Sequence, residues 1–337
     1  MHGVSRVKQS QAALEAKRQR ERAKLKEYLA LSDEILSRKK RGDLGMESLA
    51  LTTKMLQINP EFYTVWNYRR NIYLGVIFPN STPEQINETL ERDLVMTTIA
   101  LKAHPKVYCI WTHRRWCLAQ TPEGPGREGD DIHGWRMKNW KQELFVVEKM
   151  LGVDARNFHA WNYRRYILEN MPVKKPDIDE LVYTTKKIQA NFSNFSAWHQ
   201  RSKTYPLLWE SNVLDSEKSR EEEFDLVRNA MYTDPEDQSV WVYHRWLVGS
   251  GEDIELLKRE IRAIKELLEE EAGSKWCMES LVHYQTLLVQ RHYAVLGDGE
   301  YGRLRANSLE LLQQLETQDP LRKQRYRDIA SSFPSNQ

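Results

Sequence analysis

Residues 61–70 read EFYTVWNYRR, and residues 156–165 end on the same five letters in RNFHAWNYRR. Three related phrases are WTHRR from Trp111, WHQRS from Trp198 and WVYHR from Trp241. The five tryptophans are separated by 45, 50, 37 and 43 residues. Periods of this size are typical of stacked supersecondary units, so the phrase predicts a repeat protein.

Each phrase follows a helix-start signal and an apolar segment. A capping residue lies seven positions before each tryptophan, in Asn59-Pro60, His104-Pro105, Asp154-Ala155, Asn191-Phe192 and Asp234-Pro235. Asn and Asp are good N-caps and Pro is tolerated at the first helical position, so a helix is expected to begin there. Upstream, apolar residues recur at helical spacing, as in Leu49, Leu51, Met55, Leu56 and Ile58. Each unit is therefore predicted to be two helices joined by a tight turn.

Two degenerate units extend the array. Trp276 lies 35 residues after Trp241, and Tyr326 follows Asp319-Pro320 at the tryptophan spacing. The sequence therefore predicts an all-α fold with a charged N-terminal helix in residues 1–44 and about seven hairpins in residues 45–337, continuous with that helix. Insertions between hairpins are expected to be surface loops at residues 78–83, 121–134 and 171–176.

Composition excludes several classes of protein. With 15 Gly and 12 Pro in 337 residues, long helices fit better than many short strands. The net charge of +2 gives no reason to expect nucleic acid, although residues 1–41 hold twelve Lys or Arg against five acids. The three cysteines are widely spaced without CxxC, which argues for a reducing compartment and against a metal site in this chain alone. The chain opens on no secretory signal and has no membrane-length apolar run, so a cytoplasmic protein is expected.

The repeated phrase itself is expected to be structural. In W-x-x-R-R the tryptophan and both arginines occupy one helix face. A tryptophan at the same position in every unit can pack against the next unit, and the arginines can bond neighbouring carbonyls or acids. The alternative is an arginine ladder for nucleic-acid phosphates.

Function is expected where one repeat departs from its siblings. Five residues before the tryptophan stand Glu61, Lys106, Arg156, Ser193 and Glu236. In the first turn of a helix the dipole favours acids, so Lys106 and Arg156 violate the preference in consecutive units. Cations beside free backbone N–H groups make an anion site, and the alternative is two surface cations without a partner.

Further donors share this edge of the second and third units. Tyr108, Asn157 and His159 stand in neighbouring columns, and His159 is the one large ionisable group in its own column. Together with Lys106 and Arg156 they could hold a phosphate. Individually, Asn157 or His159 could equally be a helix cap or a satisfied structural group.

The phrase resembles the repeat of protein prenyltransferase α subunits over nearly the whole chain. The family fold is an α–α superhelix, a right-handed crescent of hairpins around a catalytic β subunit. KVYCIWTHRRW, ARNFHAWNYRR and TDPEDQSVWVYHRWL are most like the Rab (type II) geranylgeranyl form, of the compact fungal type. The farnesyl or type I form, or a non-enzymatic helical-repeat scaffold, are the alternatives.

The resemblance implies roles for particular residues and partners. Lys106 matches the family lysine that reaches the isoprenoid diphosphate, Tyr108, Asn157 and His159 match residues along the same edge, and Arg156 is placed there less firmly. The resemblance implies transfer of geranylgeranyl from its diphosphate to C-terminal cysteines of Rab GTPases, presented by an escort protein. Zinc is expected on the β subunit, with His2 as a transient ligand at most.

Overall fold

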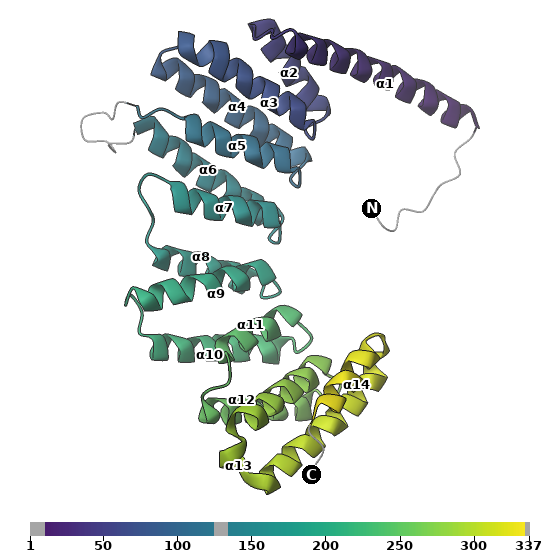
Figure 1. Ribbon diagram of the computed structural model, residues 1–337, viewed down its shortest axis with the longest axis vertical. Coiled ribbons are helices and arrows are strands. Elements are labelled where there is room, and N and C mark those ends of the chain that lie inside the picture. The colour runs from purple at the N-terminus through teal and green to yellow at the C-terminus, as the bar shows by residue number, and fades with distance from the viewer. Residues whose placement is uncertain (1–10, 125–133, 334–337) are drawn as a thin grey trace. The chain divides into compact units, whose positions relative to one another are not determined.

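The computed structural model describes residues 11–124 and 134–333. Within these ranges the chain forms α-helices, three short π- or 3-10 segments and no strand (Figure 1). The helices are α1 (Gln11–Lys40), α2 (Met46–Ile58), α3 (Tyr63–Ile72), α4 (Pro83–Ala103), α5 (Tyr108–Gln120), α6 (Gly134–Val153), α7 (Phe158–Asn170), α8 (Asp177–Ala190), α9 (Phe195–Glu210), α10 (Ser216–Thr233), α11 (Gln238–Val248), α12 (Ile254–Glu270), α13 (Lys275–Gln318) and α14 (Lys323–Ser332). The predicted all-α fold is confirmed.

The chain divides into two compact units, residues 1–174 and 175–337. The first holds α1 and the hairpins α2/α3, α4/α5 and α6/α7. The second holds α8/α9, α10/α11, α12 with the first part of α13, and the last part of α13 with α14. α13 is broken at His292 and at Gly297, where φ of +70° suits glycine, so the sixth and seventh hairpins share one kinked helix. The described residues thus contain the seven predicted hairpins.

The turn inside each hairpin is longer than predicted. Asn59 is the C-cap of α2, and α3 begins three residues after Pro60, at Tyr63. The prediction that such residues are N-caps is therefore wrong. The Asn59 Oδ1 atom accepts the Glu61 N–H at 3.0 Å, and Asp234 does the same for Glu236 at 3.0 Å. These side chains form Asx-turns, the other conformation that Asn and Asp favour.

The repeated tryptophan closes this turn. In the five repeats that carry the phrase, the indole N–H donates to the carbonyl six residues earlier. The bonds run from Trp66, Trp111, Trp161, Trp198 and Trp241 to Pro60, Pro105, Ala155, Phe192 and Pro235, at 2.8, 3.0, 2.9, 2.6 and 2.8 Å. All five rings are buried. A buried indole needs a partner for its N–H, so the spacing between the Pro-like position and the tryptophan is a hydrogen-bond constraint.

The first arginine of the phrase is buried rather than spread over the surface. Arg114 has no exposed area and bonds both carboxylate oxygens of Glu143 on α6, at 2.8 and 2.5 Å. Arg69 with Asp93, and Arg201 with Glu223, repeat the arrangement at distances of 2.5 to 2.8 Å. Each acid lies on the first helix of the following hairpin, so the pair links neighbouring hairpins within a unit. The predicted bonds to neighbouring acids are confirmed.

The same arginine also binds the first helix of its own hairpin. The Arg114 Nη1 atom donates to the Leu94 carbonyl and to the hydroxyls of Thr97 and Thr98, at 2.7, 2.7 and 2.8 Å. These acceptors lie 20, 17 and 16 residues before Arg114. Arg69 and Arg201 bond Leu-x-x-Thr-Thr groups at identical offsets, namely Leu49, Thr52 and Thr53, and Leu181, Thr184 and Thr185. The guanidinium therefore fixes the register of the two helices of a hairpin.

The remaining segments agree with the predicted loops where they are described. Residues 78–82 form a 3-10 turn and the cap of α4, and residues 171–176 connect α7 to α8. Residues 125–133 of the predicted 121–134 loop lie outside the described residues. α1 is largely exposed, with Ser32 and Ile35 buried against its neighbours. No helix among the described residues combines the length and the apolarity of a membrane span.

Candidate functional site

The turns of the second and third hairpins lie side by side in the first unit. The Asn157 Nδ2 atom donates to the carbonyl of Pro105 at 3.3 Å, which joins the two turns directly. The Lys106 Nζ atom lies 3.8 Å from an Asp154 carboxylate oxygen across the same junction. The structure therefore brings the predicted residues of the second and third hairpins to one edge of the first unit.

Lys106 lies just outside its helix. It precedes Val107, the N-cap residue of α5, so the expectation that it occupies the first helical turn is wrong by two residues. Its side chain is 71% exposed. The dipole still gives this helix end a positive potential, and Lys106 adds a full charge beside it.

The backbone amide of Lys106 also differs from its siblings. In the other four tryptophan repeats, the amide five residues before the tryptophan donates to the Asn or Asp two residues earlier. These amides belong to Glu61, Arg156, Ser193 and Glu236, at 3.0, 3.2, 3.0 and 3.0 Å. His104 replaces that acceptor in the second unit. Among the described residues the Lys106 amide has no acceptor, so one residue offers both a free N–H and an ammonium group.

His159 lies beneath two aromatic rings at this edge. The Tyr108 ring meets the imidazole edge-on at a centroid distance of 4.3 Å, and the Phe158 ring lies 3.9 Å from it. Burial, and then the nearby charge of Lys106, lower the pKa of His159 below its usual value. The imidazole is therefore neutral at pH 7, with one ring N–H as a donor. Tyr108 is 64% exposed, which leaves its hydroxyl open to a ligand.

Asn157 and Arg156 have different surroundings. Asn157 is buried and is the N-cap of α7, where its side-chain oxygen accepts from the amides of His159 and Ala160 at 3.0 and 3.3 Å. Arg156 is exposed, and its amide is bound by Asp154. The Asn157 side chain is thus already engaged in shaping the edge, whereas the Arg156 side chain extends into solvent.

We expect Asn157→Ala to lower the free energy of unfolding by about 0.5–2 kcal/mol, the usual cost of losing an N-cap. Thermal denaturation measures the change. Asn157→Asp is the matched variant, because it keeps the cap acceptor and loses only the bond to the Pro105 carbonyl. Full stability of Asn157→Ala would contradict the cap assignment.

Sequence reasoning missed two members of this edge. Asp154 was interpreted as a helix cap, whereas it lies opposite Lys106 and holds the Arg156 amide. Phe158 is 57% exposed and stands in a column with Tyr63 and Tyr108, which are 62% and 64% exposed. The signal available in the sequence was the run of aromatic residues three positions before the tryptophan in the first three repeats.

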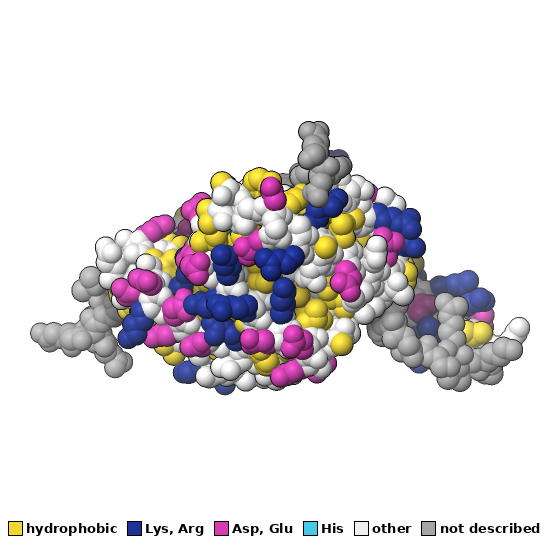
Figure 2. Space-filling model, turned by 90° about the horizontal axis from the view of Figure 1, so that it is seen from below, with side chains coloured by type: hydrophobic (Ala, Val, Ile, Leu, Met, Phe, Trp, Pro, Cys, Tyr) yellow, Lys and Arg dark blue, Asp and Glu magenta, His cyan; other side chains and the backbone are white. Residues whose placement is uncertain are grey.

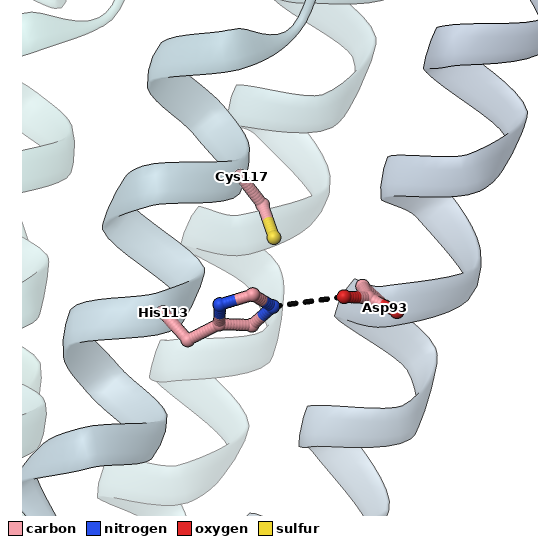
Figure 3. A group of neighbouring side chains, drawn as sticks. All are labelled: Asp93, His113 and Cys117. Atoms are coloured by element: carbon pink, nitrogen blue, oxygen red, sulfur yellow. Dashed lines mark hydrogen bonds and ion pairs between the residues drawn. The ribbon is translucent and has the colours of Figure 1, made fainter. Parts of the chain in front are cut away.

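A second group of polar side chains is buried away from this edge. Asp93 on α4 and His113 and Cys117 on α5 converge, and the His113 Nε2 atom lies 2.9 Å from an Asp93 oxygen (Figure 3). Such a trio has the residue types of a metal site. Its neighbours decide whether lone pairs remain for an ion.

Asp93 and His113 are already saturated with protein hydrogen bonds. Asp93 also accepts from Arg69 at 2.8 and 2.5 Å and from the Tyr73 hydroxyl at 2.8 Å, and the His113 Nδ1 atom accepts from the Arg70 Nε atom at 3.3 Å. Burial lowers the pKa of His113 to about 4 and raises the pKa of the Cys117 thiol well above its usual value. Both imidazole nitrogens are engaged, so the group is part of the buried Arg–carboxylate linkage and does not fit a metal ion.

Comparisons with known proteins agree with this architecture. The model of the protein prenyltransferase alpha subunit repeat matches residues 46–75, 90–121, 140–171, 178–206 and 220–250. The chain is 40% identical to "Geranylgeranyl transferase type-2 subunit alpha" of Schizosaccharomyces pombe, over 85% of this chain and 86% of that protein. It is 36% identical to the human protein of the same name, over 77% of this chain but 43% of the human one.

A solved structure shares the fold. It is titled "Candida albicans protein geranylgeranyltransferase-I complexed with GGPP", and its matching chain aligns with a TM-score of 0.67 over 92% of this chain and 91% of that chain. The sequences are 19% identical, so the similarity concerns the fold alone.

Proposed function

The chain belongs to the protein prenyltransferase α-subunit family, and on that premise we propose that it is the α subunit of a heterodimeric type 2 geranylgeranyl transferase. The assignment to type 2 rests on the 40% identity to the fission-yeast type-2 α subunit across 85% of the chain. The type I enzyme is less favoured, because the neighbour of that name is 19% identical.

The reaction is the alkylation of a protein thiolate. The sulfur of a C-terminal Rab cysteine forms a bond to C1 of the geranylgeranyl group, and the C1–oxygen bond breaks as diphosphate leaves. We place the zinc that lowers the pKa of the substrate thiol on the β subunit, because the Asp93 carboxylate and both imidazole nitrogens of His113 are already engaged in hydrogen bonds.

The contribution of this chain is electrostatic. Negative charge grows on the departing diphosphate, and the edge around Lys106 offers an ammonium group, a free amide N–H and the Tyr108 hydroxyl. Donors fixed in place before the reaction stabilise such charge without reorganisation. His159 adds a neutral imidazole donor, and Arg156 adds an exposed guanidinium. The Asn157 side-chain oxygen is already engaged as the cap of α7, so Asn157 orients this edge and does not bind the diphosphate.

The remaining partners follow from the same assignment. Rab GTPases, presented by an escort protein, are the acceptors, and geranylgeranyl diphosphate is the donor. We place the protein in the cytoplasm, in keeping with Cys109, Cys117 and Cys277, which are all free thiols. His2, the suggested transient zinc ligand, lies outside the described residues.

Co-expression tests the proposal. With a type 2 β subunit, the chain should co-purify as a heterodimer and transfer geranylgeranyl to a Rab protein in the presence of its escort. The chain by itself should transfer none, because residues 11–124 and 134–333 supply no fitting zinc site. A heterodimer that prefers farnesyl diphosphate would favour the farnesyl form, and a chain that binds no β subunit would favour a non-enzymatic scaffold.

A further inference from the structure

A pocket of about 220 Å³ lies in the second unit, between α11, α13 and α14. Its polar lining includes Arg245 and His283, and its apolar lining includes Val282, Leu312, Leu315 and Ile329. At roughly 30 Å³ for each water-sized group, it has room for about seven such groups. The pocket therefore suits a small ligand with one polar and one apolar end.

Arg245 has no partner in this pocket. It is the second arginine of its repeat, half-buried, and its Nε atom is buried without a hydrogen bond. Within the described residues its guanidinium forms no ion pair. Buried polar atoms are nearly always bonded, so the unbonded Nε atom beside this cavity indicates a missing acceptor.

The corresponding arginines of the first two repeats have a partner for the guanidinium group, although the Arg115 Nε atom is also buried without a hydrogen bond. The Arg70 Nε atom bonds His113, and its guanidinium lies over the Trp116 ring, while Arg115 lies over the Tyr166 ring at 4.7 Å. Trp116 and Tyr166 each lie five residues after the tryptophan of the following repeat. In the repeat that follows Arg245, the residue five positions after Trp276 is Leu281. The smaller side chain leaves Arg245 without its covering ring.

The other charged residues that line the pocket, Glu279 and Arg325, pair with each other. Glu279 accepts from the Tyr326 hydroxyl at 2.8 Å and pairs with Arg322 and Arg325 at 3.5 and 3.8 Å. Figure 2 shows Lys and Arg side chains interspersed with Asp and Glu on the face that it draws. On α14, Lys323 and Arg327 pair with Glu316 of α13 at 3.7 and 3.0 Å, unlike Arg245.

We propose that this pocket binds a short organic carboxylate, with the carboxylate on Arg245 and His283 and the carbon chain on Leu312, Leu315 and Ile329. A guanidinium matches a carboxylate in a two-bond geometry. Burial and the charge of Arg245 lower the pKa of His283 to about 4, so the neutral imidazole adds one donor while Arg245 supplies the charge. This site is independent of the proposed prenyl transfer.

Methyl NMR of the full chain in its native assembly tests the site. Butanoate should shift the Ile329 methyl signal saturably with a Kd of about 1 mM, a reasonable affinity for six non-hydrogen atoms. Butyramide, which has the same shape without the charge, should bind at least tenfold more weakly, the usual loss with a charged hydrogen bond. Inorganic phosphate as a second probe tells an organic carboxylate from a small anion of any kind.

The matched variants are Arg245→Gln and Arg70→Gln. Arg245→Gln should weaken butanoate at least tenfold and leave the melting temperature unchanged, because its guanidinium bonds no described residue. Arg70→Gln changes the equivalent arginine of the first repeat and should leave binding intact. The proposal is wrong if butanoate gives no saturable shift, if butyramide or phosphate binds as well, or if both variants have equal effects.

Discussion

Lys106→Ala is expected to lower the single-turnover rate of prenyl transfer by about 10- to 1,000-fold, the range for removing one preorganised electrostatic contact. The effect should fall on the chemical step more than on diphosphate binding, because the leaving-group charge is largest in the transition state. Rapid-quench kinetics of the heterodimer measure that step. The variant should stay assembled, since Lys106 lies in an exposed turn away from the buried tryptophans.

Two controls separate this role from a structural one. Glu61→Ala changes the same position of the first repeat and should alter the rate little. Asp154→Asn removes the carboxylate that lies 3.8 Å from the lysine but keeps the oxygen that binds the Arg156 amide. If Asp154→Asn or Glu61→Ala slowed the reaction as much as Lys106→Ala, the lysine would act through the turn and not on the diphosphate.

Arg114→Met should lower the free energy of unfolding by about 3–5 kcal/mol, the usual cost of stranding one member of a buried ion pair. Arg114 and Glu143 are both inaccessible, and the substitution leaves the carboxylate with the Tyr163 hydroxyl alone, at 2.5 Å. The melting temperature should fall by on the order of 10 °C. Calorimetry of the purified heterodimer measures the change.

A second substitution tests the cause. The double variant Arg114→Met with Glu143→Gln leaves no buried charge at this pair, and Tyr163 keeps its partner. Most of the lost stability should therefore return. Arg327→Ala, which breaks an exposed pair with Glu316, should change little. If the double variant proved no more stable than Arg114→Met, packing of the arginine stem would be the dominant contribution.

The sequence predicted the hairpins because the tryptophan phrase recurs at a period typical of stacked units and follows segments with helical spacing. It misplaced the start of the second helices, since Asn59-Pro60 suits both an N-cap and an Asx-turn, and local chemistry does not choose between them. The choice is made by the Trp66 indole, whose bond to the Pro60 carbonyl requires an open turn.

Only part of the candidate site could be predicted, again because local sequence does not show contacts with distant residues. Lys106 and Arg156 were visible because they depart from an aligned column, and the Lys106 to Asp154 contact joins residues 48 positions apart. The Leu-x-x-Thr-Thr groups were missed, because threonine pairs such as Thr97 and Thr98 look like ordinary helix-surface residues. Their meaning depends on Arg114, which arrives from the opposite helix.

The bond between the arginine and its Leu-x-x-Thr-Thr group restricts where residues can be inserted into the chain. The offset of 16 residues is the same for Arg69, Arg114 and Arg201, whereas the distance from each arginine to its acid is 24, 29 and 22 residues. One residue added inside a hairpin would rotate a helix by about 100° and misalign these bonds. Residues added between hairpins leave them in place. Reporter tags and new binding loops therefore belong at junctions such as Ser81, which lies between the first and second hairpins.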